Sequence, residues 1–159
     1  MAEHERNVTK KKGKLVLASG TFDLLHLGHV RYLEEAKKVG GKNARLLVIV
    51  ARDKTVEKRK GTRPVMPEEH RRALVESLKV VDQAILGYEE FDIGSVIEEL
   101  KPDIIAVGYD QTAIEEQVRK AIKQRNLPVR VVRISKFGRD ELDSSFKIKK
   151  KITELSRLR

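Results

Sequence analysis

Short apolar runs alternate with longer amphipathic stretches along the whole chain. The runs are rich in Val, Ile and Leu, which is typical of strands that are buried on both faces of a parallel sheet. The pattern therefore predicts five buried strands, at Leu15–Ala18, Arg45–Ala51, Gln83–Leu86, Ile104–Val107 and Val129–Ile134.

The stretches between these runs carry apolar residues three or four positions apart, the spacing of an amphipathic helix that crosses over a sheet. They predict helices at Leu27–Val39, Glu68–Leu78, Ile93–Leu100 and Ala113–Gln124, and a last helix that begins near Ser144 or Ser145. This alternation predicts an α/β fold with one domain, a doubly wound five-stranded parallel sheet covered on both faces. Such sheets bind ligands at the carboxyl ends of their strands, where the winding direction reverses.

Length and composition agree with one domain. The chain has 159 residues, of which 40% are apolar, which is enough to fill a single core. We expect the domain to span residues 14–159, after a basic N-terminal tail at 1–13. The lack of cysteine excludes disulfides, cysteine-ligated zinc, iron–sulfur clusters and thiol catalysis. The longest apolar run, Leu46–Ala51, predicts neither a membrane span nor an export signal, so we expect a cytoplasmic protein.

The net charge of +10 favours an anionic partner. Residues 1–12 and 147–159 together contribute +7, which leaves +3 for residues 13–146. The body of the protein is thus only mildly basic. An RNA-binding role without catalysis is one alternative, but the seven scattered aromatic residues offer little stacking surface for single strands.

The most informative segment, Gly20–His29, follows the first predicted strand. Gly20 allows a tight turn, and Gly28 allows a phosphate to approach the backbone closely. His26 and His29 lie three positions apart at a helix start, so both face nearly the same side and add N–H donors to the free helix amides. The segment therefore predicts an anion cradle.

Further candidate residues follow the other strands and open the last helix. Asp110 follows the fourth strand, where it would bind a ribose hydroxyl, approach a metal ion or cap the next helix. Asp23 and Asp53 also lie at strand ends, and Asp23 would hold a divalent ion or stabilise a turn. Ser144 and Ser145 would bind phosphate or cap the last helix. The remaining candidates are Lys150, behind these serines, and Lys136 and Phe137, in a loop that would close over a nucleotide.

The motif His26-x-Gly28-His29 resembles the marker of the His-x-Gly-His nucleotidyltransferase superfamily. The resemblance covers almost the whole chain and is closest to the cytidylyltransferase-like branch and, within it, to the archaeal FAD synthases. Two residues depart from the branch's commoner Ile-Ser-Thr-Thr, because Asp143 replaces the Ile and Phe146 the second Thr.

The resemblance implies a HUP-type, Rossmann-like fold and transfer of AMP from ATP to FMN, which forms FAD and pyrophosphate. It implies catalytic roles for His26, His29 and Lys60, with Lys60 in a basic loop at 58–60 and reaching the phosphates from across the site. Arg71 would orient a phosphate or form a surface ion pair with an acidic residue. ATP would be bound by Thr21, Phe22, His26, Leu27, Gly28, His29, Asp110, Phe137, Ser144 and Ser145.

A divalent ion, Mg²⁺, Mn²⁺ or Co²⁺, is expected with the triphosphate, because it neutralises several charges. The sequence offers no compact protein cage for it, so the ion would arrive with the nucleotide. A homodimer is a further expectation. The enzymatic alternative is a CTP-dependent cytidylyltransferase that acts on glycerol 3-phosphate or a related phosphorylated alcohol. A Gly-x-Gly-x-x-Gly fingerprint and a Walker loop are both absent, which argues against dehydrogenases and P-loop enzymes.

Overall fold

The computed structural model describes residues 13–90, 92–138 and 142–159. Most of the predicted N-terminal tail lies outside these residues, so that boundary stays a prediction. In the described part, five parallel strands form one sheet in the order β3-β2-β1-β4-β5. The strands are β1 (Leu15–Gly20), β2 (Arg45–Val50), β3 (Gln83–Leu86), β4 (Ile104–Gly108) and β5 (Arg130–Ile134). This confirms the predicted doubly wound fold.

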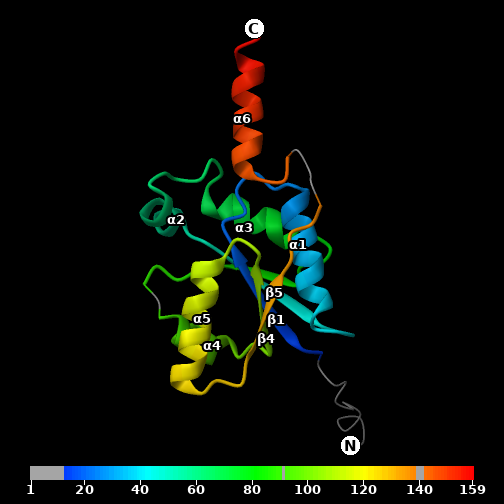
Figure 1. Cartoon of the computed structure of the whole chain (residues 1–159), viewed down its shortest axis with the longest axis vertical. Coiled ribbons are helices and arrows are strands. Elements are labelled where there is room, and N and C mark those ends of the chain that lie inside the picture. Colours follow the sequence, from blue (N-terminus) through cyan, green and yellow to red (C-terminus); the bar gives the residue numbers. More distant parts are fainter. Residues whose placement is uncertain (1–12, 91, 139–141) are drawn as a thin grey trace, which may run out of the picture.

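Six helices in the described ranges connect and follow these strands (Figure 1). They are α1 (Leu27–Lys38), α2 (Asp53–Lys60), α3 (Glu68–Glu76), α4 (Ile93–Leu100), α5 (Thr112–Arg125) and α6 (Ser145–Ser156). Figure 1 shows α6 projecting from the rest of the molecule. In the described ranges, no helix has the length and apolar character needed to cross a membrane.

The sheet carries a separate apolar core on each face because successive side chains of a strand point to opposite sides. On one face Val16 and Val48 pack with Leu33 of α1 and Val75 of α3. On the other, Leu17 and Leu47 pack with Ile97 of α4 and Val118 of α5. The predicted coverage of both faces by helices is thereby confirmed.

The winding direction reverses between β1 and β4, which lie side by side in the sheet. Beyond their paired residues, the side chain of Gln111 joins the two strand ends. Its Oε1 accepts from the Gly108 amide at 2.7 Å, and its Nε2 donates to the Ser19 carbonyl at 2.9 Å. The amide of one side chain thus satisfies backbone groups of both strands at the edge where ligands are expected.

The sequence predicted a loop for the basic segment at 58–60. The structure shows instead that this segment is the last turn of α2. This helix lacks an apolar stripe, because Val56 is its only buried residue. A helix with so little apolar periodicity gives no signal in the pattern of hydrophobic residues. It ends at Gly61, whose φ of 80° is the left-handed conformation that glycine adopts most easily.

Candidate active site

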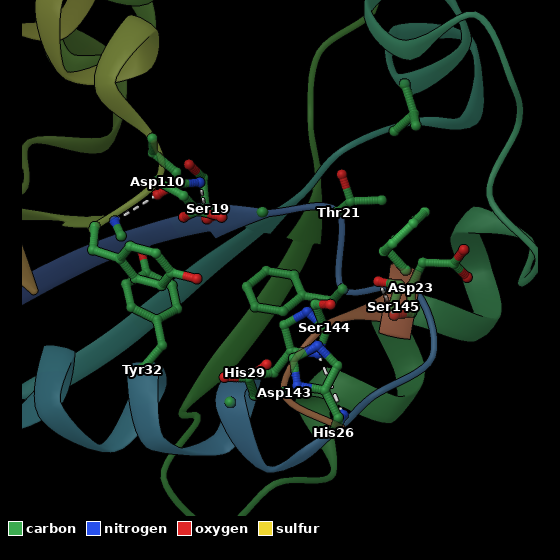
Figure 2. Close-up of a pocket in the computed structure, with 18 of the residues that line it drawn as sticks. Ser19, Thr21, Asp23, His26, His29, Tyr32, Asp110, Asp143, Ser144 and Ser145 are labelled. Atoms are coloured by element: carbon green, nitrogen blue, oxygen red, sulfur yellow. Dashed lines mark hydrogen bonds between the residues drawn. The ribbon is translucent and has the colours of Figure 1, made fainter. Parts of the chain in front are cut away.

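A cleft of about 620 Å³ lies at the carboxyl ends of β1 and β4. Its walls come from the loop after β1, the start of α1, the end of α2, the turn between β4 and α5, the loop after β5 and the start of α6. Figure 2 shows its labelled side chains, with the two histidines between those after β1 and those after β4 in this view. Twelve predicted residues line it: Thr21, Phe22, Asp23, His26, Gly28, His29, Lys60, Asp110, Lys136, Phe137, Ser144 and Ser145.

His26 and His29 lie face to face at the start of α1. Their ring centroids are 3.7 Å apart and the ring planes differ by 25°. The backbone N–H of His26 donates to Nδ1 of His29 over 3.4 Å. Since Nδ1 accepts, the proton of the neutral His29 ring resides on Nε2, which can donate to a ligand.

Burial, the nearby His26 ring and, to a smaller extent, Lys60 together lower the pKa of His29 to about 3, against the opposite effect of Asp23. His29 is therefore neutral at physiological pH. It can act as a hydrogen-bond donor but not as a cation. Because the His29 ring is uncharged, it can stack closely on the His26 ring without repulsion between like charges.

Gly28 is required by a contact within the protein. A Cβ at this position would lie 2.9 Å from the Asp143 carbonyl oxygen and 2.9 Å from the His26 ring. The absence of a side chain therefore lets the turn before α6 approach the start of α1. From the sequence we predicted that this glycine leaves space for a phosphate. The close approach of Asp143 to Gly28 was not predicted.

The loop after β1 has an unusual backbone, because Phe22 and Leu24 have φ angles of 54° and 50°. Bulky residues rarely adopt this left-handed conformation, and it persists only where the surroundings hold it. Asp23 between them supplies such contacts, since its two carboxylate oxygens accept from the amides of Val65 at 2.8 Å and Met66 at 3.0 Å. Of its two predicted roles, the geometry matches the stabilisation of a turn.

Arg71 reinforces this loop from inside the protein. Its side chain is fully buried and donates to the carbonyls of Thr21 at 2.6 Å and Met66 at 2.9 Å. A third nitrogen, Nη2, lies 2.8 Å from Oδ1 of Asp53. Arg71 therefore pairs with an acidic residue, which is one of the predicted alternatives, but its side chain is buried and the predicted surface location is wrong. Neither Arg71 nor Asp53 lines the cleft, because their polar groups are occupied by one another and by the backbone.

Four cations line the cleft on the side of α2 and α6: Arg59, Lys60, Lys149 and Arg63, which pairs with Glu57. Arg59 donates to the Thr21 hydroxyl at 3.1 Å, and Nζ of Lys149 lies 3.7 Å from Oδ2 of Asp23. Burial, followed by the nearby Arg59 and Lys149, lowers the pKa of Lys60. The sequence named Lys150 instead of Lys149, but Lys150 is exposed and outside the lining, since one residue turns a helix by about 100°.

Asp143 holds the start of α6 to the loop after β5. Its side chain is only 7% exposed, and its two oxygens lie 2.6 Å from Nζ of Lys147 and 3.5 Å from Nζ of Lys136. The hydrogen bond from Lys147, against a smaller opposing effect of burial, lowers the pKa of Asp143. Beside it, the Ser144 hydroxyl caps α6 by accepting from the Lys147 amide at 3.2 Å, and the Ser145 hydroxyl donates to the Asp23 carbonyl at 3.1 Å.

The wall after β4 carries Asp110 and the half-exposed ring of Tyr109, over which Nζ of Lys136 lies 5.6 Å from the centroid. Gln111 is the N-cap residue of α5, so the predicted capping role of Asp110 is wrong. Leu27, also predicted to contact ATP, is 50% exposed and does not line the cleft.

The predicted residues do not form a preassembled metal cage. In the described ranges, no three His, Cys, Asp or Glu side chains cluster in a way that would hold a metal ion. Mg²⁺ typically takes one or two carboxylates and completes its shell with waters and substrate phosphates. Asp110 in the cleft fits this mode of binding, whereas Asp23 and Asp143 are engaged by amides and lysines.

Stacked imidazole donors at a helix start, at the switch point of a doubly wound sheet, define a nucleotide-binding α/β protein of the His-x-Gly-His type. The chain belongs to the cytidylyltransferase-like family, whose model matches residues 17–151.

Within this family, curated relatives named FAD synthase cover nearly the whole chain. The FAD synthase of Ferroglobus placidus is 52% identical over 90% of each chain. That of Methanobrevibacter smithii is 50% identical over 89% of this chain and 92% of its own. The sequence resembles the archaeal FAD synthases, and these relatives agree with that resemblance.

Solved structures agree on the fold. A Thermoplasma volcanium protein described as a lipopolysaccharide core biosynthesis protein has a TM-score of 0.71 and 46% identity, covering 79% of this chain and 99% of its own. A pantoate-beta-alanine ligase from Francisella tularensis has a TM-score of 0.57 at 13% identity over 96% of this chain and 74% of its own, which shows the fold alone.

We expect Arg71→Met to lower the free energy of unfolding by about 3–5 kcal/mol, because it leaves Asp53 and two carbonyls without their buried partner. Arg72→Met is the matched control on the same helix. It breaks solvent-screened ion pairs to Glu69 and Glu76, so its free energy of unfolding should fall much less. Urea unfolding of both variants measures the difference, and equal losses would contradict the buried role of Arg71.

The lowered pKa of His29 also predicts how stability depends on pH. Between about 3 and the ordinary value of 6.5, the unfolded chain binds a proton at this imidazole that the folded chain does not. The free energy of unfolding should therefore fall as the pH drops below about 6.5, by up to about 1.4 kcal/mol per pH unit from this residue.

His29→Gln should flatten that dependence relative to the wild type, which urea unfolding between about pH 4.5 and 7.5 measures. His70→Gln, at an exposed imidazole of α3 outside the cleft, serves as the control and should keep the wild-type slope. An unchanged slope in His29→Gln would show that this imidazole is protonated in the folded protein.

Proposed function

We infer that this chain is an FMN adenylyltransferase that transfers AMP from ATP to FMN and forms FAD and pyrophosphate. The observation that carries this inference is about 50% identity to FAD synthases over about nine-tenths of both chains. The cleft agrees with it in chemistry, since its donors and cations suit a ligand rich in phosphate.

The reaction requires positioning more than acid–base chemistry. A phosphate oxygen of FMN attacks the α-phosphorus of ATP, the new P–O bond forms, and the bond to the β-phosphate breaks as pyrophosphate leaves. The attacking phosphate is already ionised at neutral pH, so no strong base and no covalent intermediate are needed. Catalysis then consists of in-line alignment and stabilisation of the charge that develops on the phosphoryl oxygens.

In this mechanism, His26 and His29 donate hydrogen bonds to the α-phosphoryl group. The start of α1 adds the positive end of its dipole. Because His29 is neutral, its Nε2 proton is available as a donor at any physiological pH. Lys60 faces them from the end of α2 and neutralises phosphate charge from the other side of the cleft.

The wall after β4 and β5 would receive the nucleoside of ATP. Asp110 is placed to accept from a ribose hydroxyl, and Phe137 and Tyr109 offer ring surfaces to the base. Ser144 and Ser145, at the start of α6, lie where hydroxyl and amide donors would bind the outer phosphates, with Lys136 beside them.

A divalent ion would enter with the triphosphate, with Asp110 as the carboxylate available to it in the cleft. When bound, such an ion neutralises the phosphates and stabilises the leaving pyrophosphate. The homodimer that the sequence resemblance implies stays a separate prediction.

We expect the purified protein to form FAD and pyrophosphate from ATP and FMN with Mg²⁺, Mn²⁺ or Co²⁺, measured by chromatography of the flavin. His26→Ala and His29→Ala should each lower kcat by about 10²–10³-fold, because each removes a donor to the transition state.

Two further acceptor assays test the alternatives. CTP with glycerol 3-phosphate tests the cytidylyltransferase, and ATP with a sugar phosphate tests the acceptor class that the name of the Thermoplasma volcanium protein suggests. Product in either, without FAD, would overturn the proposal. Salt-sensitive RNA retention with no product in any assay would favour the RNA-binding alternative.

Removal of divalent ions should abolish FAD formation while leaving the fold intact, since no cluster of protein ligands in the described ranges depends on a metal. Treatment with EDTA followed by gel filtration, activity assay and thermal unfolding measures both effects. Re-addition of Mg²⁺ should restore turnover. A large drop in Tm after EDTA would show a structural metal and contradict the view that the ion comes with the nucleotide.

A further inference from the structure

Phe146 is an aromatic side chain on the wall of a strongly polar cleft. It is the second residue of α6, it lines the cleft, and it is 75% exposed. A phenyl ring left in water forgoes the stabilisation that burial would give it, and it covers no core residue that would explain its position. A phenyl ring at this position offers a stacking surface rather than a hydrogen-bonding group.

Cations surround the same end of the cleft. Lys149 lies three residues after Phe146, one turn along the same side of α6, and it also lines the cleft. Arg59 and Lys60 reach the cleft from α2. Arg59 and Lys149 are close enough to Lys60 to lower its pKa, while Asp110 and Asp23 act in the opposite direction, so three cations face two carboxylates there and a dianion would balance the excess positive charge.

The cleft therefore has two ends with different chemistry. Tyr109, Asp110 and Phe137 lie after β4 and β5, where a nucleoside fits at the switch point of the sheet. Arg59 and Lys149 contact Thr21 and Asp23 of the loop after β1, and Phe146 lies one turn before Lys149 on α6. In Figure 2 Asp110 lies on one side of the histidines and Asp23 on the other. In-line displacement requires a phosphate held by these cations to approach the α-phosphorus from the side opposite the outer phosphates at Ser144 and Ser145.

We propose that Phe146, Arg59, Lys60 and Lys149 form the acceptor subsite, in which the flavin ring stacks on Phe146 and the terminal phosphate of FMN lies among the three cations. This assignment rests on the proposed FMN adenylyltransferase activity. It predicts that a planar aromatic phosphomonoester binds better than a phosphorylated alcohol such as glycerol 3-phosphate, which has no ring to stack.

The test separates the ring from the phosphate by comparing FMN with riboflavin. Phe146→Ala should weaken binding of both flavins about tenfold, because it removes the stacking surface common to both. Lys149→Gln should weaken FMN about tenfold and leave riboflavin unchanged, because it removes a partner of the phosphate. Flavin fluorescence titration measures binding without turnover, and steady-state kinetics should show a raised KM for FMN with an unchanged KM for ATP.

Controls come from the same helix, outside the cleft. Ile152→Ala removes an exposed apolar side chain and Lys151→Gln an exposed cation, and both should bind the flavins as the wild type does. Phe146→Trp should retain binding. Thermal unfolding of every variant shows whether the fold is kept, which is expected since the side chains of α6 bury little surface.

Two results would overturn the subsite. Either Phe146→Ala and Lys149→Gln keep wild-type affinity for FMN, or they raise the KM for ATP instead of that for FMN. In both cases, FAD formation by the wild type would still stand, so the subsite alone fails. A wild type that makes no FAD and binds neither flavin would remove the proposed function and the subsite with it.

Discussion

The left-handed loop after β1 is the constraint on which the rest of the site depends. Two bulky residues in this loop, Phe22 and Leu24, have positive φ angles, which cost energy that the surroundings must offset. Arg71 and the carboxylate of Asp23 supply that support by joining the loop to residues 65–66 and to the start of α2. Breaking a buried charge pair is costly, so this arrangement disfavours other paths for the loop and delivers His26 and His29 to one place.

The charged groups of the cleft are arranged so that most carboxylates pair with cations of the protein. Cations come from three separate elements, whereas burial keeps His29 neutral, so this imidazole contributes no charge. Asp143 pairs with Lys136 and Lys147 and holds these lysines in place, while the nearby Arg59 and Lys149 lower the pKa of Lys60 against the opposite effect of Asp110 and Asp23. A polyphosphate binding here would therefore relieve repulsion at one end of the cleft and meet oriented neutral donors at its centre.

The sheet and the placement of His26 beside His29 at the start of α1 were predictable from the sequence because their signals are local. Buried strands appear as β-branched runs, and His26-x-Gly28-His29 lies within four residues. Long-range contacts left no such trace. The burial of Arg71 depends on carbonyls at Thr21 and Met66, and the bridge by Gln111 depends on the pairing of β1 with β4. Which lysine of α6 lines the cleft, Lys149 or Lys150, depends on which side of the helix faces the cleft. The spacing of apolar residues cannot show that side, because α6 has no buried face.

The cleft is divided between firmly packed and thinly packed elements. The histidines proposed to act on the α-phosphoryl group lie at the start of α1, which packs with β1 in the core through residues such as Val16 and Leu33. The proposed acceptor groups belong to α2 and α6, and α2 buries only Val56 while α6 buries no side chain. Substitutions on such thinly anchored helices change little packing, so acceptor specificity can diverge at Phe146 and Lys149 without disturbing the histidines. A phenyl ring at the start of α6 is the side chain expected there if the acceptor is a flavin.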